Sequence, residues 1–264
     1  MFSSFMINTW IVVTLVAVVA GLVGFFIVLR GASFAAHALP LGTFPGAALA
    51  GLLGINSFIG LIVFAGVSVA GINQLAKNGR HEVATALTLV MLLSLGTVFL
   101  SISSQYSQQV YALLFGEVLG VSRAELLPVA AISILATGLT VRLFYPLILS
   151  SVSAELADVQ GISAKKMELW FLAILALATA MALPVVGALL VFSLMVGPAA
   201  VARMLISRPV PAVLLSVAIA LLTVWLAIAL SYETNWPVGF FVGGFGALFY
   251  ALAKCWQAFR RGGK

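Results

Sequence analysis

The 264-residue sequence is 63% hydrophobic and only 8% charged, with a formal net charge of +6. Soluble domains carry about 25% charged residues, so this composition excludes a water-soluble fold. The sequence has no basic patch with interleaved aromatic residues, so we interpret the positive charge as cationic loops and expect no nucleic acid among the partners. The apolar residues fall in stretches of about 20, which predicts an all-α, polytopic transmembrane bundle in a lipid bilayer.

Nine apolar stretches are candidate spans of a single transmembrane domain, residues 1–264. In chain order they cover roughly Trp10–Leu29, Ala36–Leu53, Phe58–Leu75, Val83–Ile102, Leu126–Leu149, Leu169–Leu183, Val185–Ile206, Ala212–Leu230 and Val238–Ala253. The first stretch is too long for the core of a signal peptide, so we expect it to be retained. The sixth and seventh meet at Pro184 with almost no loop and could form one re-entrant or sharply broken element, which leaves eight or nine spans open.

The basic residues predict the orientation of these spans. With nine spans, all of the 13 Lys and Arg residues except Arg123 fall on one side of the membrane. Because positively charged loops face the cytoplasm, we expect the N-terminus outside and the C-terminus inside. The single cysteine, Cys255, cannot form an internal disulfide and lies near the predicted cytoplasmic end, where thiols stay reduced.

The start of the second span carries His37, a candidate metal ligand. The segment Ala36–Gly46 contains two prolines, two glycines and Thr43, and we expect irregular backbone beside a cavity there. An imidazole is a common ligand of transition metals, so His37 could line a metal path. Alternatively, His37 is a neutral, hydrogen-bonded histidine at the end of a helix.

The other candidate ligands are weaker. His81 and Glu82 are adjacent, and consecutive residues on a helix do not share a face, so we interpret them as a solvated helix start. Methionines such as Met91, Met181 and Met195 are more typical of packing than of metal binding. The seven acidic residues fall at span ends or in loops, which disfavours a proton-relay pump. The sequence has no G-x-x-x-x-G-K-[ST] motif, so any ATP that drives this protein is bound by another subunit.

Two connections between spans are long. Ser103–Glu125, on the predicted outer side, is polar, and Tyr111–Phe115 within it could form a short surface helix. On the predicted inner side, the loop of about residues 150–166 contains Ser153–Gly161, which predicts a short helix with Ser153 as N-cap and an end at Gly161. A small amphipathic helix on the cytoplasmic face is typical of a docking element.

Several motifs occur in an order that resembles the ABC-3 family of metal-transporter permeases, along nearly the whole chain. The most specific is Leu183–Val191 continuing through Gly197–Arg203, which is similar to the family pattern VVGxLLV…PAAxAR. The supporting matches are Val28–Phe34, Pro45–Leu49, Leu114–Leu119, Glu155–Gly161 and Pro237–Gly239. Of these, Leu114–Leu119 contains Glu117.

This resemblance implies the membrane-spanning permease subunit of an ATP-driven ABC importer in a prokaryotic plasma membrane. The chain would not be an enzyme itself. Its partners would be a second permease copy, a cytoplasmic ABC ATPase dimer and an extracytoplasmic metal-binding protein. The cargo would be a divalent transition metal ion, with no permanently bound cofactor. In that frame, the helix with Glu155, Asp158 and Gly161 would couple the permease to the ATPase.

The sequence also departs from the family pattern. Members often carry D-A-L-S-H in the second span, whereas here His37 stands at the aspartate position, Pro40 at the serine and Leu41 at the histidine. The pathway candidates are then His37, Thr43 and Glu117, with His37 as the metal ligand. A nitrogen ligand without a carboxylate suits zinc better than manganese, so the order we expect is zinc, manganese, iron. A self-sufficient secondary carrier or channel and an ABC permease for a metal chelate are the alternatives.

Overall fold

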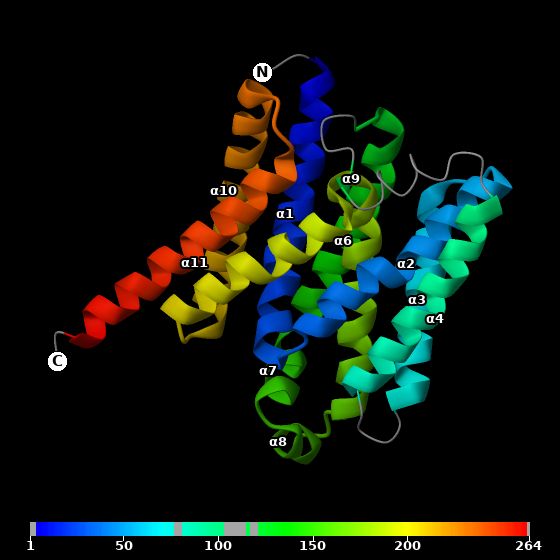
Figure 1. Cartoon of the computed structure of the whole chain (residues 1–264). Coiled ribbons are helices and arrows are strands. Elements are labelled where there is room, and N and C mark those ends of the chain that lie inside the picture. Colours follow the sequence, from blue (N-terminus) through cyan, green and yellow to red (C-terminus); the bar gives the residue numbers. More distant parts are fainter. Residues whose placement is uncertain (1–3, 77–80, 103–114, 117–120, 263–264) are drawn as a thin grey trace.

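The computed structural model describes residues 4–76, 81–102, 115–116 and 121–262. Within these ranges every regular element is a helix, which confirms the all-α prediction (Figure 1). The helices are α1 (Ser4–Arg30), α2 (Ser33–Leu53), α3 (Ser57–Leu75), α4 (His81–Ile102), α6 (Arg123–Arg142), α7 (Phe144–Val152), α8 (Ala154–Val159), α9 (Ala164–Leu205), α10 (Pro209–Thr234) and α11 (Val238–Gly262).

Eight helices in the described part of the chain are long and apolar enough to cross a membrane. A ninth apolar segment, Leu190–Leu205, is shorter. It forms the second part of α9 and turns back from the end that the first part, Ala164–Ala188, reaches (Figure 1). The sequence left eight or nine spans open, and the structure explains why: one of the nine is a shorter helix joined directly to its predecessor.

The break in α9 lies at Gly187 and not at Pro184, where the sequence placed it. Gly187 has φ 75° and ψ 160°, a combination that is essentially restricted to glycine. Proline is locked near φ −65° and cannot make this turn. Pro184 is therefore accommodated within the first part of α9, and the chain reverses three residues later.

The expected fifth span, Leu126–Leu149, is also divided. The helix ends at Arg142, and α7 begins at Phe144 after Leu143, whose φ and ψ are −99° and 11°. Pro146 explains this break, because in one continuous helix its ring would clash with the carbonyl group four residues earlier. In the first turn of α7, the missing N–H of proline has no intrahelical partner to lose.

The centre of the bundle is formed by α1 and the first part of α9. Of the most apolar stretch of each helix, 72% is buried, against 17% in α11. Close backbone contacts fix α1 in place: a Cβ on Gly24 would lie 2.0 Å from the carbonyl oxygen of Met195. On the neighbouring turn, the Ser216 hydroxyl of α10 donates to the Gly21 carbonyl oxygen at 2.7 Å. Small residues thus let α9 and α10 approach α1 closely.

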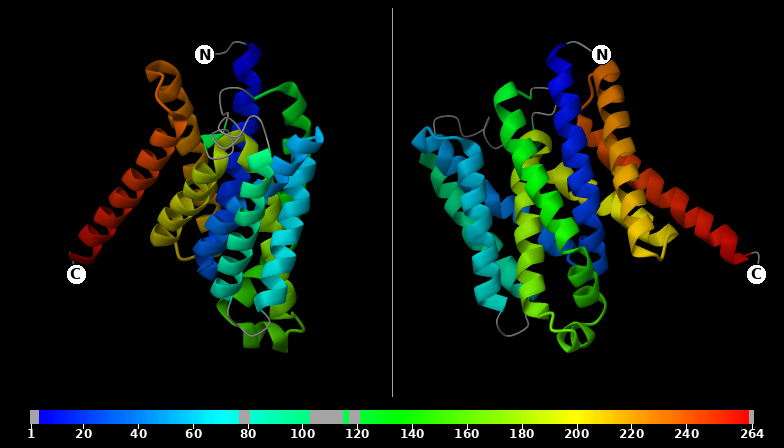
Figure 2. Two further views of the ribbon diagram at one scale, coloured as in Figure 1. Left: turned by 45° about the vertical axis from the view of Figure 1, so that its right-hand side comes forward. Right: turned by 180° about the vertical axis from the view of Figure 1, so that it is seen from behind.

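The helices alternate in direction, so that α7 and α8 lie at the same end as the C-terminus of α1 and the start of α9 (Figures 1 and 2). We call this the basic end, because the described Lys and Arg residues other than Arg123 lie at or near the helix ends on this side of the molecule: Arg30, Arg142, Lys165, Lys166, Arg203, Arg208, Lys254, Arg260 and Arg261. Arg123 begins α6 at the opposite end. The basic residues gather as the sequence predicted, and the side of the membrane that they face stays a prediction.

Candidate transport pathway and the cavity at the basic end

His37 lies in the second turn of α2 and is partly buried. Its ring packs edge-on against Phe192 of α9, with ring centroids 5.1 Å apart and an interplanar angle of 76°. Within the described residues, no group of three or more His, Cys, Asp or Glu side chains could hold a metal ion. His37 therefore offers a single nitrogen between α2 and the Leu190–Leu205 segment, and its role as a ligand stays a prediction.

Thr43 is fully buried in α2, and its hydroxyl donates to the Pro40 carbonyl oxygen at 2.8 Å. The irregular backbone that we expected around the two prolines is absent here, because Pro40 and Pro45 both lie within a continuous helix. The Thr43 hydroxyl oxygen can still accept a hydrogen bond or bind a ligand, but its proton is donated to the Pro40 carbonyl oxygen. Glu117, the third pathway candidate, lies outside the described residues.

A small pocket lies between α2, α3 and α4, and its mainly apolar lining includes three residues with hydroxyl groups, Ser68, Thr85 and Thr88. It measures about 10 Å³, close to the space of one water molecule. The Ser68 hydroxyl donates to Phe64 and the Thr85 hydroxyl to His81, each at 2.8 Å within its own helix. The Thr88 hydroxyl is buried without a partner among the described residues. An unpaired buried hydroxyl is costly, so this pocket is a place where a polar guest would be stabilised.

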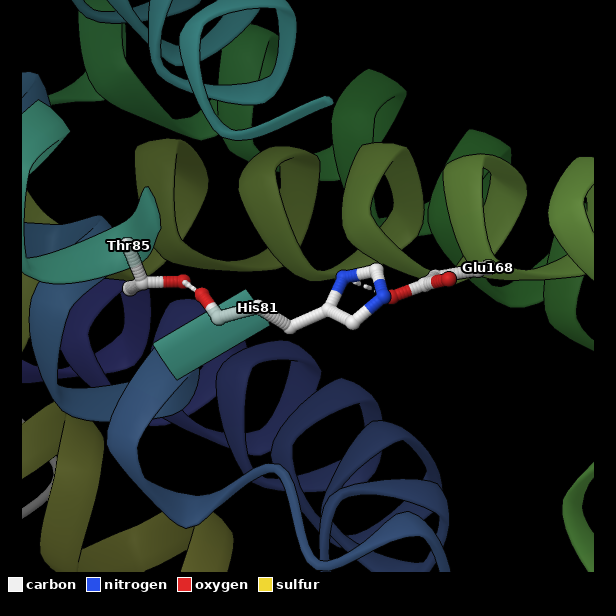
Figure 3. Close-up of polar contacts among 3 residues, drawn as sticks. All are labelled: His81, Thr85 and Glu168. Atoms are coloured by element: carbon white, nitrogen blue, oxygen red, sulfur yellow. Dashed lines mark hydrogen bonds and ion pairs between the residues drawn. The ribbon is translucent and has the colours of Figure 1, made fainter. Parts of the chain in front are cut away.

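A larger cavity of about 350 Å³ opens at the basic end. It lies between the end of α1, the starts of α2, α4 and α9, and the end of α7. Across it, His81 Nδ1 and Glu168 Oε1 are 2.7 Å apart (Figure 3). The two side chains are 49% and 37% exposed, so water and ions can reach them. The other polar side chains that line the cavity are Arg30, Glu82, Thr85, Ser150 and Ser151.

Arg30 joins three helices at the wall of this cavity. Its Nη2 donates to the Ser150 hydroxyl at 2.6 Å and to the Leu147 carbonyl oxygen at 3.3 Å, both on α7. Its guanidinium lies 5.0 Å from the ring centre of Phe171 on α9. Arg30 thus links α1, α7 and α9, and its positive charge also interacts electrostatically with Glu168.

The short helix at the basic end is confirmed as α8. The Ser153 hydroxyl accepts a hydrogen bond from the Leu156 backbone N–H at 3.1 Å, which caps its start. At its end, Ile162 N–H donates to Ala157 and Gly161 N–H to Asp158, the pattern of a Schellman motif, with Gly161 at φ 76°. Glu155 and Asp158 of this helix are both exposed.

Sequence reasoning missed four residues at this end. Leu156 and Val159 of α8 are 49% and 85% exposed, and their spacing of three residues on a predicted surface helix was the available signal. His81 was interpreted as part of a solvated helix start, and Glu168 was not singled out. No local pattern could pair them, because the contact joins α4 to α9.

The sequence matches the model of the ABC 3 transport family over residues 2–255. It is 29% identical over 251 residues to the manganese import system permease protein ScaB of Streptococcus parasanguinis, covering 94% of this chain and 89% of that one. It is also 29% identical to the high-affinity zinc uptake system membrane protein ZnuB of Buchnera aphidicola, covering 86% and 88%. Among solved structures, PsaBC from Streptococcus pneumoniae in complex with Fab matches with a TM-score of 0.85 and 26% identity, covering 96% of this chain and 91% of that chain.

Proposed function

The chain belongs to the ABC 3 transport family, and from this premise we propose that it is the permease subunit of an ATP-driven importer for divalent transition metal ions. The observation that carries the proposal is the family match over residues 2–255, together with a relative named for manganese import that aligns with 94% of the chain. In this proposal residues 1–264 form one permease domain, and ATP is hydrolysed by a separate subunit.

We place manganese before zinc and iron as the cargo. The expectation of zinc first depended on His37 alone, and it gains no support from the relatives. Most of the relatives found are named for manganese transport, whereas single relatives are named for zinc and for iron. Since His37 belongs to no group of three or more His, Cys, Asp or Glu side chains among the described residues, it does not by itself discriminate between these ions.

We assign α8 to the contact with the cytoplasmic ATPase dimer. Its exposed surface combines two carboxylates, Glu155 and Asp158, with two apolar side chains, Leu156 and Val159. Exposed apolar side chains on a single-turn helix outside the spans are typical of a binding surface. The Schellman motif at Gly161 fixes the turn at the end of α8, and α9 begins three residues later at Ala164, so a displacement of α8 is passed to α9 along a short connection. This assignment makes the basic end cytoplasmic, in a prokaryotic plasma membrane.

A second permease copy is the partner that we propose for α11. This helix diverges from the bundle (Figure 1), and its most apolar stretch is only 17% buried. A Cβ on Gly243 or Gly244 would meet nothing within 4 Å. Glycines on an exposed face of a membrane helix let another helix approach closely. An extracytoplasmic metal-binding protein completes the proposed assembly at the opposite end.

Uptake by reconstituted vesicles tests the proposal. The chain, its candidate ATPase and its candidate binding protein are reconstituted together, and uptake of manganese, zinc and iron is measured with and without ATP, with His37→Ala beside the parent. We expect ATP-dependent uptake of at least one ion, and lower uptake with His37→Ala if the imidazole is a ligand. Flux through the chain alone, without the ATPase, would instead indicate a self-sufficient carrier or channel. ATP hydrolysis without uptake of any of the three ions would indicate another cargo, such as a metal chelate.

A further inference from the structure

The cavity at the basic end brings two metal-binding side chains together from separate helices. His81 is the first residue of α4, and Glu168 lies at the start of α9. Their side chains meet at 2.7 Å beside the cavity, as the close-up shows (Figure 3). Ion pairs this exposed contribute little to stability, so the pair is not needed to hold α4 against α9.

The chemistry of the pair suits a first-row transition metal. An imidazole nitrogen and a carboxylate oxygen are both ligands of zinc and manganese. A metal ion held about 2.1 Å from each atom requires a nitrogen-to-oxygen distance of about 3.0 to 3.4 Å, for bond angles between right-angled and tetrahedral. The present distance between Nδ1 and Oε1 is 2.7 Å. The two side chains must therefore separate by well under 1 Å, while the proton between them moves to Nε2 or to water.

The surroundings provide space and charge for such an ion. The cavity of about 350 Å³ leaves room for the water molecules that complete the coordination sphere. Glu82 and Glu168 bring two negative charges to its wall and Arg30 one positive charge, whose guanidinium is bound to α7 and stacked on Phe171. Among the described residues, no third His, Cys, Asp or Glu side chain is grouped with His81 and Glu168 as a further ligand. Two protein ligands with water hold an ion loosely, which is what release from a transporter requires.

The cavity beside the pair also adjoins the small pocket between α2, α3 and α4. Ile72 and Thr85 line both this cavity and the small pocket between α2, α3 and α4. The unpartnered hydroxyl of Thr88 belongs to that small pocket. Thr85 itself bonds to the His81 carbonyl oxygen, so the wall between the two spaces is one turn of α4.

We propose that His81 and Glu168 form a divalent-metal site at the basic end, where a transported ion is held together with water before it leaves the protein. The proposal rests on the proposed function, because the cargo supplies the ligand. It adds a site that is separate from His37, whose ring packs against Phe192 and does not line this cavity.

Metal binding to the purified full-length chain in lipid nanodiscs tests this site. Manganese binding is followed by electron paramagnetic resonance, with zinc as competitor, for the parent, His81→Asn and Glu168→Gln. We expect each substitution to weaken binding at least tenfold, because each removes one of two protein ligands. Glu82→Gln is the matched control: it removes the same charge from the same cavity without removing a ligand, and we expect a change of less than about threefold.

Thermal unfolding of each variant separates lost binding from lost folding, and Glu168→Asp, which keeps a carboxylate, should retain part of the binding. Equal affinity in the parent, His81→Asn and Glu168→Gln overturns the site, as does a parent that binds neither ion. This outcome is distinct from failure of the proposed function. If the assembled transporter takes up metal with ATP while these substitutions leave binding unchanged, only the site at His81 and Glu168 is wrong.

Discussion

The centre of the bundle and its basic end are held together by different forces. In the centre, α1 and the first part of α9 are largely buried, and α1 also contacts the second part of α9 through the backbone at Gly24. At the basic end, the helices meet around a cavity through a few half-exposed polar contacts, among them His81 with Glu168. The comparison indicates that buried packing in the centre contributes most to stability, and that the exposed polar contacts at the basic end contribute less. Substitutions in the two regions should therefore affect different properties.

The largest effect on stability is expected at Gly24. In Gly24→Ala, the new Cβ would lie 2.0 Å from the backbone oxygen of Met195, and a backbone atom cannot rotate away. We expect the free energy of unfolding to fall by about 3 kcal/mol, the upper range for overpacking a core. Thermal unfolding in nanodiscs measures it. The control is Gly66→Ala, where a Cβ meets nothing within 4 Å and the helix should gain slightly. Equal melting temperatures for the two variants would contradict the close packing of α1 on α9.

A large effect of another kind is expected on α8. In the double variant Leu156→Asp, Val159→Asp, two exposed apolar side chains become charged, so the chain should fold with a change in stability of about 0.5 kcal/mol or less. We expect ATP-dependent metal uptake to fall at least tenfold while the ATPase still hydrolyses ATP. Glu155→Ala with Asp158→Ala should uncouple the two activities in the same direction.

The matched control for α8 is Glu233→Ala, an exposed acidic residue near the end of α10, at the opposite end of the bundle. It should leave both uptake and hydrolysis unchanged. If ATP hydrolysis stays coupled to metal uptake in both α8 variants, the assignment of this helix to the ATPase contact is wrong.

A smaller change is expected at Gly161, which joins α8 to α9. Its φ of 76° falls in the left-handed region, so Gly161→Ala should cost about 1 kcal/mol although the space around it is open. Gly138→Ala, also in open space but inside α6 with no positive φ, serves as control and should not destabilise the protein. The measurement is thermal unfolding, followed by uptake, because a misplaced α8 should lower coupling more than stability. Equal stability of both variants would mean that the turn adapts without strain.

The smallest effect on stability is expected for the pair at the cavity. Because His81 and Glu168 are 49% and 37% exposed, His81→Asn, Glu168→Gln and their combination should each change the free energy of unfolding by less than about 1 kcal/mol. A double-mutant cycle on thermal unfolding gives the coupling between the two side chains. A coupling free energy well above about 1 kcal/mol would make the pair a structural contact. The difference in stability between the centre and the basic end would then not hold at this position.

The sequence predicted the elements that depend on local chemistry. The number and approximate limits of the spans follow from apolar stretches, because a helix in lipid satisfies its own backbone wherever it packs. The start and end of α8 were likewise predictable, since Ser153 and Gly161 act on backbone groups within the same turn. The resemblance to ABC-3 permeases, made on short motifs, is confirmed by the family match over residues 2–255. The candidate pathway residues His37, Thr43 and Glu117 stay a prediction, because the usual ligands are replaced and Glu117 lies outside the described residues.

Only the tertiary structure decided which segments, far apart in the sequence, contact one another. Pro184 marked the break between the sixth and seventh stretches approximately, but the reversal lies at Gly187, where the backbone takes a conformation that is essentially restricted to glycine. The division of the fifth span at Leu143 was not predicted. The contact of His37 with Phe192, and that of His81 with Glu168, join helices that only packing brings together. The sequence by itself determined a membrane bundle with a basic end and a short exposed helix, since burial in lipid and helix capping are local. The cavity, and the metal-binding pair beside it, depend on how α1, α4, α7 and α9 pack.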